Sequence, residues 1–186
     1  MHTGKLSSMR AIPVAAFSCF AALSLLAALN VTGSPASVAT RASAPKCATS
    51  RLVIWLNSPG NGAAGSIYYD LQLTNLGRRA CILRGYPGVS AVNLAGHQLG
   101  RGAGRDGYQK PTTVTLVHGA TATAVLRITE AGVLPASLCR EVTAAGLRVY
   151  PPGRTAARIV PFPFQACSGS RVSNMTVSRV GPFKEE

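Results

Sequence analysis

Acidic residues are scarce in this sequence. Its 186 residues include 6 Asp and Glu against 19 Lys and Arg, together with 3 His. General acid–base catalysis needs proton-carrying side chains held beside a reacting group. Neither a G-x-S-x-G nucleophile elbow nor an H-E-x-x-H zinc motif is present in the sequence. We therefore predict no catalytic residues and no enzymatic activity.

The N-terminal segment has the order of a secretory signal peptide. Lys5 and Arg10 precede an apolar stretch over 11–29, and helix-breaking and small residues follow it. We predict export from the cytoplasm, with cleavage after Gly33 or Ala39. A retained membrane anchor is the alternative, because the apolar stretch approaches the roughly 20 residues that a spanning helix needs. The predicted organisation is a signal peptide at 1–39, a linker at 40–46, one domain at 47–183 and a tail at 184–186.

Closely spaced metal ligands are missing from the exported part. Its cysteines are Cys47, Cys81, Cys139 and Cys167, separated by 34, 58 and 28 residues, whereas structural zinc sites use close pairs such as C-x-x-C. We predict no metal and no cofactor. An even number of cysteines in an oxidising compartment instead predicts two disulfides. Of the three possible pairings we favour the two that are local in sequence, Cys47–Cys81 and Cys139–Cys167, each contributing roughly 3–4 kcal/mol.

The charge of the exported part is strongly positive. From residue 40 onward it has 17 basic and 6 acidic residues, a formal charge of +11. Such a charge favours adhesion to polyanions, which here means anionic lipid head groups or phosphate-bearing wall polymers. The alternative is that the arginine bias reflects codon usage and solubility, since the charges are scattered and no run of five occurs. We predict no specific nucleic-acid partner and a monomeric domain.

Short apolar runs separated by Gly, Pro and Asn turns dominate the domain. Over 67–74 apolar and polar residues alternate, as in a half-buried strand. A dense turn signal occupies 57–62, and 135–145 is the only predicted helix. About eight strands, at most one short helix and two disulfides predict an all-β fold, an antiparallel β-sandwich of the immunoglobulin-like kind.

A glycine- and arginine-rich loop is predicted over 100–110. Its stretch Gly102-Ala-Gly-Arg-Asp-Gly107 matches G-x-G-x-x-G, but no buried strand precedes it and no helix follows, so we do not interpret it as a dinucleotide site. Arg101 and Arg105, together with backbone amides of the loop, are the predicted anion-binding residues.

Several stretches together resemble one protein family. They are Cys47, Gly62-Ala-Ala-Gly65, Leu71-Gln-Leu-Thr-Asn-Leu-Gly77, Cys81-Ile-Leu-Arg-Gly-Tyr-Pro-Gly-Val89, Thr115 to Ala122, Leu147 to Gly153 and Val160 to Cys167. The pattern is similar to an actinobacterial secreted domain catalogued as domain of unknown function four-two-three-two, and the resemblance covers residues 47 to 182. It implies a secreted or lipid-anchored sandwich domain, often with disulfides, and no catalytic residues. This chain lacks a lipobox, because Cys19 lies inside the apolar stretch.

Two turns within the resemblance suggest structural roles. Asn75 and Gly77 suit a turn with positive φ, and Pro87 and Gly88 suit the centre of a type II turn.

We therefore expect a secreted, non-enzymatic β-sandwich that associates with the cell envelope or another anionic surface. The alternative is a protein–protein interaction module for another secreted protein, using an open sheet edge or the 100–110 loop. An exported hydrolase is a third hypothesis, and it requires His97 or His118 to lie beside an acid and a hydroxyl.

Overall fold

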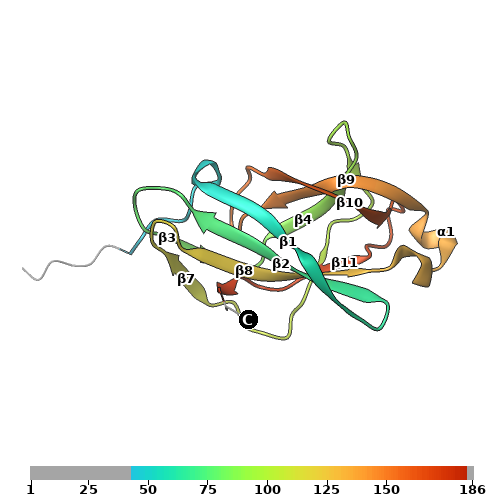
Figure 1. Ribbon diagram of the computed structural model, residues 1–186, viewed down its shortest axis with the longest axis horizontal. Coiled ribbons are helices and arrows are strands. Elements are labelled where there is room, and N and C mark those ends of the chain that lie inside the picture. Colours follow the sequence, from blue (N-terminus) through green and yellow to red (C-terminus); the bar gives the residue numbers. More distant parts are fainter. Residues whose placement is uncertain (1–42, 184–186) are drawn as a thin grey trace, which may run out of the picture. The chain divides into compact units, whose positions relative to one another are not determined.

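The computed structural model describes residues 43–183 (Figure 1). The predicted signal peptide, the first part of the predicted linker and the predicted tail lie outside the described residues. The strands are β1 (Leu52–Ala63), β2 (Ser66–Asn75), β3 (Cys81–Arg84), β4 (Gly88–Val92), β5 (Gln98–Leu99), β6 (Gly104–Arg105), β7 (Thr113–Leu116), β8 (Thr121–Thr129), β9 (Glu141–Tyr150), β10 (Arg158–Cys167), β11 (Met175–Val177) and β12 (Gly181–Pro182). The helical segments of this part are α1 (Ala136–Cys139) and two 3-10 turns, η1 (Thr49–Arg51) and η2 (Ala131–Val133).

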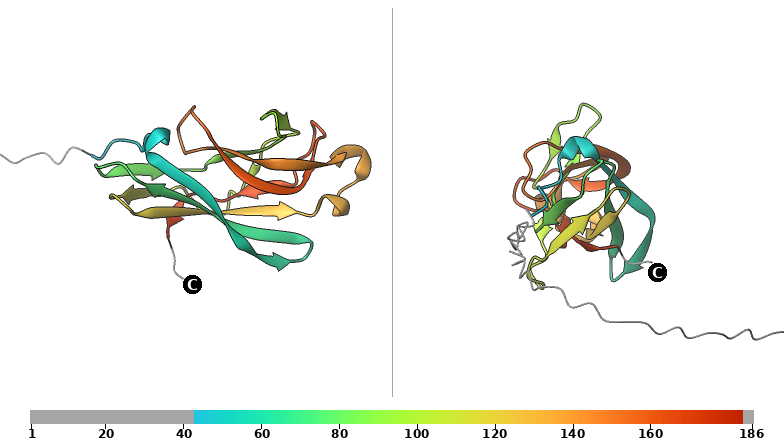
Figure 2. Two further views of the ribbon diagram at one scale, coloured as in Figure 1. Left: turned by 45° about the horizontal axis from the view of Figure 1, so that its top comes forward. Right: turned by 90° about the vertical axis from the view of Figure 1, so that its left-hand side faces the viewer.

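Two sheets form the layers of a sandwich (Figure 2). The larger sheet has the order β1-β2-β8-β11-β6, with β12 also paired to β8, and the smaller has the order β10-β9-β4-β5. β3 and β7 form a separate two-stranded sheet. The order of β1, β2 and β8 matches strands A, B and E of an immunoglobulin-like domain, and β4, β9 and β10 match C, F and G. The prediction of a β-sandwich with two disulfides is confirmed, and one pair, β11 with β6, is parallel.

The core lies between the inner faces of β2, β8 and β9. Leu71, Leu73, Leu126, Leu147 and Val149 have no exposed surface. Each is one of a series of alternate residues that a strand directs to a single face. Burying a side chain of this size contributes about 1.5–3 kcal/mol, so the alternation recognised in the sequence accounts for much of the drive to fold.

The predicted turn over 57–62 is wrong. β1 continues to Ala63, and its register against β2 shifts between Asn57 and Asn61. The chain reverses at Ala64 and Gly65, which both have positive φ. A β-bulge absorbs the turn-forming residues within an edge strand, where proline is tolerated. Gly60 is needed there, because a Cβ atom would lie 2.5 Å from Cγ2 of Ile67.

The predicted helix over 135–145 is too long. α1 ends at Cys139, and Arg140 adopts a left-handed conformation with φ of 47°. From Glu141 onward the chain is β9, which pairs with β10 from Cys167 back to Arg158. Pairing along the whole length of β10 outweighs the local helical preference of the alanines at 144 and 145.

Both predicted disulfides are present. Cys47–Cys81 joins the N-terminal segment to the start of β3, with a Cα–Cα distance of 4.8 Å. Cys139–Cys167 joins the end of α1 to the end of β10, with a Cα–Cα distance of 4.5 Å. The two bonds lie at opposite ends of the described domain (Figure 1).

Candidate functional site

A cavity of about 460 Å³ lies beside the first disulfide. We call it the basic cavity. Its walls are the N-terminal segment and the loop between β2 and β3, and its charged lining residues are Lys46, Arg51, Arg78 and Arg79. Within the described chain, no Asp or Glu lines it. Four cations around one open space create a positive potential that attracts anions.

The two walls of the basic cavity are fastened to each other. The Cys47–Cys81 bond links them covalently. The backbone N–H of Cys47 donates to the carbonyl of Ile82 at 3.0 Å, and the N–H of Ile82 donates to the carbonyl of Pro45 at 2.8 Å. The cations on the two walls are therefore held on a fixed scaffold.

Asn75 shapes the second wall. It is 1% exposed, and its amide nitrogen donates to the carbonyls of Arg79 at 3.1 Å and Leu116 at 3.0 Å. Its amide oxygen accepts from the N–H of Gly77 at 2.8 Å. Neither Asn75 nor Gly77 has positive φ, and neither does Gly88, so those predictions of backbone conformation are wrong. The asparagine acts instead through its side chain, which folds the loop back on itself.

Gly77 allows the two walls to approach closely. A Cβ atom at this position would lie 3.3 Å from Cβ of Arg51 and 3.0 Å from the amide oxygen of Asn75. The N–H of Leu76 donates to the carbonyl of Arg51 at 2.9 Å. The glycine therefore lets the backbone of Arg51 and its loop partner meet without a steric conflict.

Two further arginines reinforce the first wall. Nε of Arg154 donates to the carbonyl of Cys47 at 2.8 Å, and its Nη2 donates to the carbonyl of Lys46. Arg158 reaches the carbonyls of Thr49 and Ser50 at 3.4 and 3.3 Å. These contacts bring six cationic side chains to one end of the sandwich.

The acidic residues of the described part lie elsewhere. They are Asp70 on β2, Asp106 in the loop after β6, and Glu130 and Glu141 on either side of α1. Figure 1 shows α1 at the end of the sandwich opposite β3, where the first disulfide is formed. No acidic residue of the described part therefore lines the basic cavity, although cations also lie along the rest of the domain.

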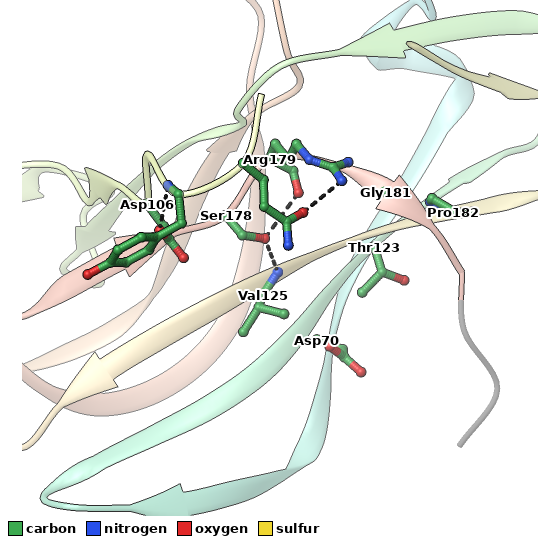
Figure 3. A pocket seen from close by; sticks show the side chains of 10 residues that line it. Asp70, Asp106, Thr123, Val125, Ser178, Arg179, Gly181 and Pro182 are labelled. Atoms are coloured by element: carbon green, nitrogen blue, oxygen red, sulfur yellow. Dashed lines mark hydrogen bonds between the residues drawn. The ribbon is translucent and has the colours of Figure 1, made fainter. Parts of the chain in front are cut away.

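A second cavity, of about 540 Å³, lies on the six-stranded sheet (Figure 3). Its lining carries both signs of charge, from Asp70, Asp106 and Arg179. Arg179 donates to Oε1 of Gln109 at 2.7 Å and to Oγ1 of Thr112 at 2.9 Å. These bonds fasten the loop over 106–112 to the segment between β11 and β12. Because Arg179 is engaged within the protein, this cavity offers less free positive charge than the basic cavity.

The predicted anion-binding arginines do not line a common cavity. The guanidinium of Arg105 lies over the ring of Tyr86, 5.6 Å from its centroid. It lines a cavity of about 460 Å³ with Arg127 and Asp106, and Arg101 is not among the lining residues. Arg101 is exposed in the preceding loop. Anion binding by this pair stays a prediction.

His97 and His118, either of which could serve the hydrolase hypothesis, are both exposed. His97 lies in the turn between β4 and β5. His118 lies in the turn between β7 and β8, where its Nδ1 is 3.3 Å from the carbonyl oxygen of Gly77. Neither lines the cavity that Asp70 and Asp106 share. Among residues 43–183, no group of three His, Cys, Asp or Glu is placed to hold a metal ion. No helix in that range is long and apolar enough to cross a membrane.

The cations of the basic cavity were not singled out from the sequence. A usable signal was present, because Lys46 precedes Cys47 and the pair Arg78-Arg79 lies shortly before Cys81. The predicted disulfide therefore already implied that these positive charges meet.

Comparison with known proteins identifies a family. No match was found among curated proteins or among solved structures. The family model described as Domain of unknown function (DUF4232) matches residues 47–183. This match covers most of the chain and agrees with the resemblance carried by the stretches around Cys47 and Cys81. The chain belongs to the DUF4232 family.

Proposed function

We propose that this domain works outside the cytoplasm as a non-enzymatic binding module that associates with an anionic component of the cell envelope. The observation that carries the proposal is the excess of positive charge, part of which is concentrated around the basic cavity. Residues 43–183 contain 15 Lys and Arg against 4 Asp and Glu. Six of the cations gather around the N-terminal segment and the first disulfide.

Two disulfides support the extracytoplasmic part of the proposal. Disulfides form and persist in oxidising compartments and are rare in the cytosol of most organisms. Both bonds here have the Cα–Cα separation of an ordinary disulfide, 4.8 and 4.5 Å. The predicted signal peptide is consistent with the same location.

The physical basis of the association is long-range attraction followed by close contact. A basic residue near an anionic membrane surface contributes about 1 kcal/mol, and the attraction decays over a Debye length. That length is about 30 Å at 0.01 M salt and about 3 Å at 1 M. Six cations at about 1 kcal/mol each contribute about 6 kcal/mol, which corresponds to a Kd of some tens of micromolar at low ionic strength. Screening at high ionic strength should release the domain.

Co-sedimentation with vesicles tests the proposal. The protein is mixed with vesicles of phosphatidylcholine, with or without phosphatidylglycerol, and in parallel with isolated cell wall. We expect binding to the anionic vesicles or to the wall at low salt, release at high salt and no binding to pure phosphatidylcholine. Absence of binding to both anionic materials at low salt would refute envelope association through charge.

A second candidate function is supported by the outer face of the six-stranded sheet. Val53, Trp55, Tyr68 and Val125 expose 37–45% of their surface there, on the neighbouring strands β1, β2 and β8. Aromatic side chains of this kind are enriched where proteins contact each other. We expect a protein partner to use this face if the domain is an interaction module.

The two functions respond differently to salt. Cross-linking in envelope extract should capture a defined partner at high salt with the unmodified protein. Trp55→Ala should abolish that capture while leaving vesicle binding unchanged. Capture that disappears in high salt and is insensitive to Trp55→Ala would instead reflect charge alone.

A further inference from the structure

We infer that the basic cavity is a specific site for a phosphate ester group. The inference rests on the proposed envelope association and deepens it, because it assigns the contact to four named side chains and one ligand chemistry. The remaining positive charge then attracts the domain to a surface, and the basic cavity holds an individual phosphate.

The first argument is that the hydrogen-bond donors of the basic cavity are free. Within residues 43–183, several arginines use their guanidinium groups inside the protein; they are Arg127, Arg148, Arg154, Arg158 and Arg179. In the same part of the chain, the side chains of Lys46, Arg51, Arg78 and Arg79 make no hydrogen bond, and all four residues are exposed. Their donors are therefore available to a ligand.

The second argument is the match between these donors and a phosphate. Arg51, Arg78 and Arg79 line the cavity from two walls together with Lys46, and no carboxylate lines it. The ammonium group of Lys46 lies beside Gly153, 3.6 Å from the position of a Cβ atom there, so the three arginines are the main donors. A carboxylate presents two oxygens in one plane, whereas a phosphate ester presents oxygens in several directions around a tetrahedral centre. Guanidinium forks bind phosphate oxygens in pairs. The volume of about 460 Å³ is that of a small-molecule site.

The third argument is that the site exists before a ligand arrives. The disulfide, the two bonds between residues 45–47 and Ile82, and the side chain of Asn75 fix both walls. Binding then requires ordering of the cationic side chains alone, and a preorganised site loses less affinity to ordering.

The test compares two double variants that remove the same charge. Arg78→Gln with Arg79→Gln removes two cations from the basic cavity. Arg140→Gln with Arg171→Gln removes two exposed cations from the segments next to the second disulfide and is the matched control. All four arginines are exposed, so both variants should fold, and thermal unfolding checks this. Dissociation constants are measured with phosphatidylglycerol vesicles and with soluble polyglycerol phosphate.

We expect the cavity variant to bind roughly 30-fold more weakly and the control no more than about 3-fold more weakly, because only the first loses charge-assisted hydrogen bonds to the ligand. Arg78→Lys with Arg79→Lys keeps the charge but removes the fork, and should fall between the two. The probe that shows this ordering identifies the source of the phosphate, a lipid head group or a wall polymer.

Three results would overturn the inference. Equal weakening in the two glutamine variants would leave envelope association in place and remove the specific site. If the cavity variant loses as much affinity for dextran sulfate as for polyglycerol phosphate, the cavity does not select phosphate. Failure of the unmodified protein to bind any of these polyanions at low salt would instead refute the proposed function itself.

Discussion

Replacing Asn75 with alanine isolates the contribution of one buried amide to the loop that carries Arg78 and Arg79. The side chain is 1% exposed and makes three hydrogen bonds of good length, at 2.8, 3.0 and 3.1 Å. A fourth contact, to the carbonyl of Val117 at 3.4 Å, is too long to count fully. Alanine removes all of these bonds and leaves their partners without replacement.

The magnitude follows from the number of bonds lost. Each buried hydrogen bond contributes about 1 kcal/mol net, and a buried partner left unpaired adds to the loss. We therefore expect Asn75→Ala to lower the free energy of unfolding by about 3 kcal/mol. For a domain of this size that corresponds to a fall in Tm of about 10 °C. Urea denaturation gives the free energy, and calorimetry gives Tm.

Aspartate at the same position tests the orientation of the amide. Asn75→Asp preserves the acceptor for the N–H of Gly77 but replaces the donor to Arg79 and Leu116 with a second oxygen. Two carbonyls would then face a buried carboxylate, which costs several kcal/mol unless it is paired. Asn75→Asp should therefore be less stable than Asn75→Ala. If aspartate is tolerated as well as alanine, the amide nitrogen does not face these carbonyls and the reasoning is wrong.

Three other perturbations have expected outcomes. Removing the second disulfide with Cys139→Ala and Cys167→Ala should cost about 3.6 kcal/mol, from the entropy of a loop with sequence separation 28, while phosphate binding stays unchanged in a vesicle titration. Gly146→Ala should destabilise the domain by about 2 kcal/mol in urea, because its Cβ would lie 2.5 Å from the carbonyl oxygen of Val160, and full stability would show that β9 and β10 can separate there. Burial raises the pKa of the Tyr69 phenol, so as pH rises the unfolded chain loses this proton before the folded protein does. The free energy of unfolding should therefore fall as pH rises from about 10 through the pKa of the folded state. Tyr69→Phe should make Tm less dependent on pH between about 9 and 11, and an unaltered dependence would contradict the burial effect.

The strands that could be predicted are those in which side-chain alternation and the final sheet agree. The alternation over 67–74 predicts one row of core-facing side chains, and Leu71 and Leu73 of that row on β2 are fully buried. The disulfide pairing was also predictable from local sequence. Each bond joins consecutive cysteines, which is the pairing that closes the two shorter loops. Local sequence contains this information because the side-chain period of a strand is independent of its partner.

The predictions that failed depend on a partner strand. Residues 57–62 contain a strong turn signal, but β2 offers hydrogen bonds to β1 on both sides of the bulge at Asn57 and Asn61. Residues 141–145 have local helical preference, but β10 offers a full ladder to β9. In both places the cooperative pairing of two distant segments outweighs the preference of one, which a single segment cannot reveal.

The candidate site could not be predicted from the sequence alone, because its cations belong to two separate segments of the chain. Arg101 and Arg105 are close in sequence and suggested a loop site, yet Arg105 lies over Tyr86 and lines a cavity that Arg101 does not reach. Arg51 and Arg78 are distant in sequence and line one cavity. Two residues that are close in sequence share a site only if the loop between them folds so that both side chains face the same space. The sequence of a glycine-rich loop does not determine that conformation.

The stability of the cavity variant separates a binding site from an incidental cluster of arginines. Like charges that share one cavity repel each other, by about 1 kcal/mol for a pair 4 Å apart in water and less when salt screens them. If Arg78 and Arg79 are retained for a ligand, replacing both with glutamine should raise the free energy of unfolding by about 0.5–1 kcal/mol. The same change should strongly reduce the rise in Tm that polyglycerol phosphate produces in the unmodified protein, because a ligand stabilises the folded state according to its affinity for that state. A variant that is less stable than the unmodified protein, with the rise in Tm intact, would show that these arginines pack against the fold and do not bind phosphate.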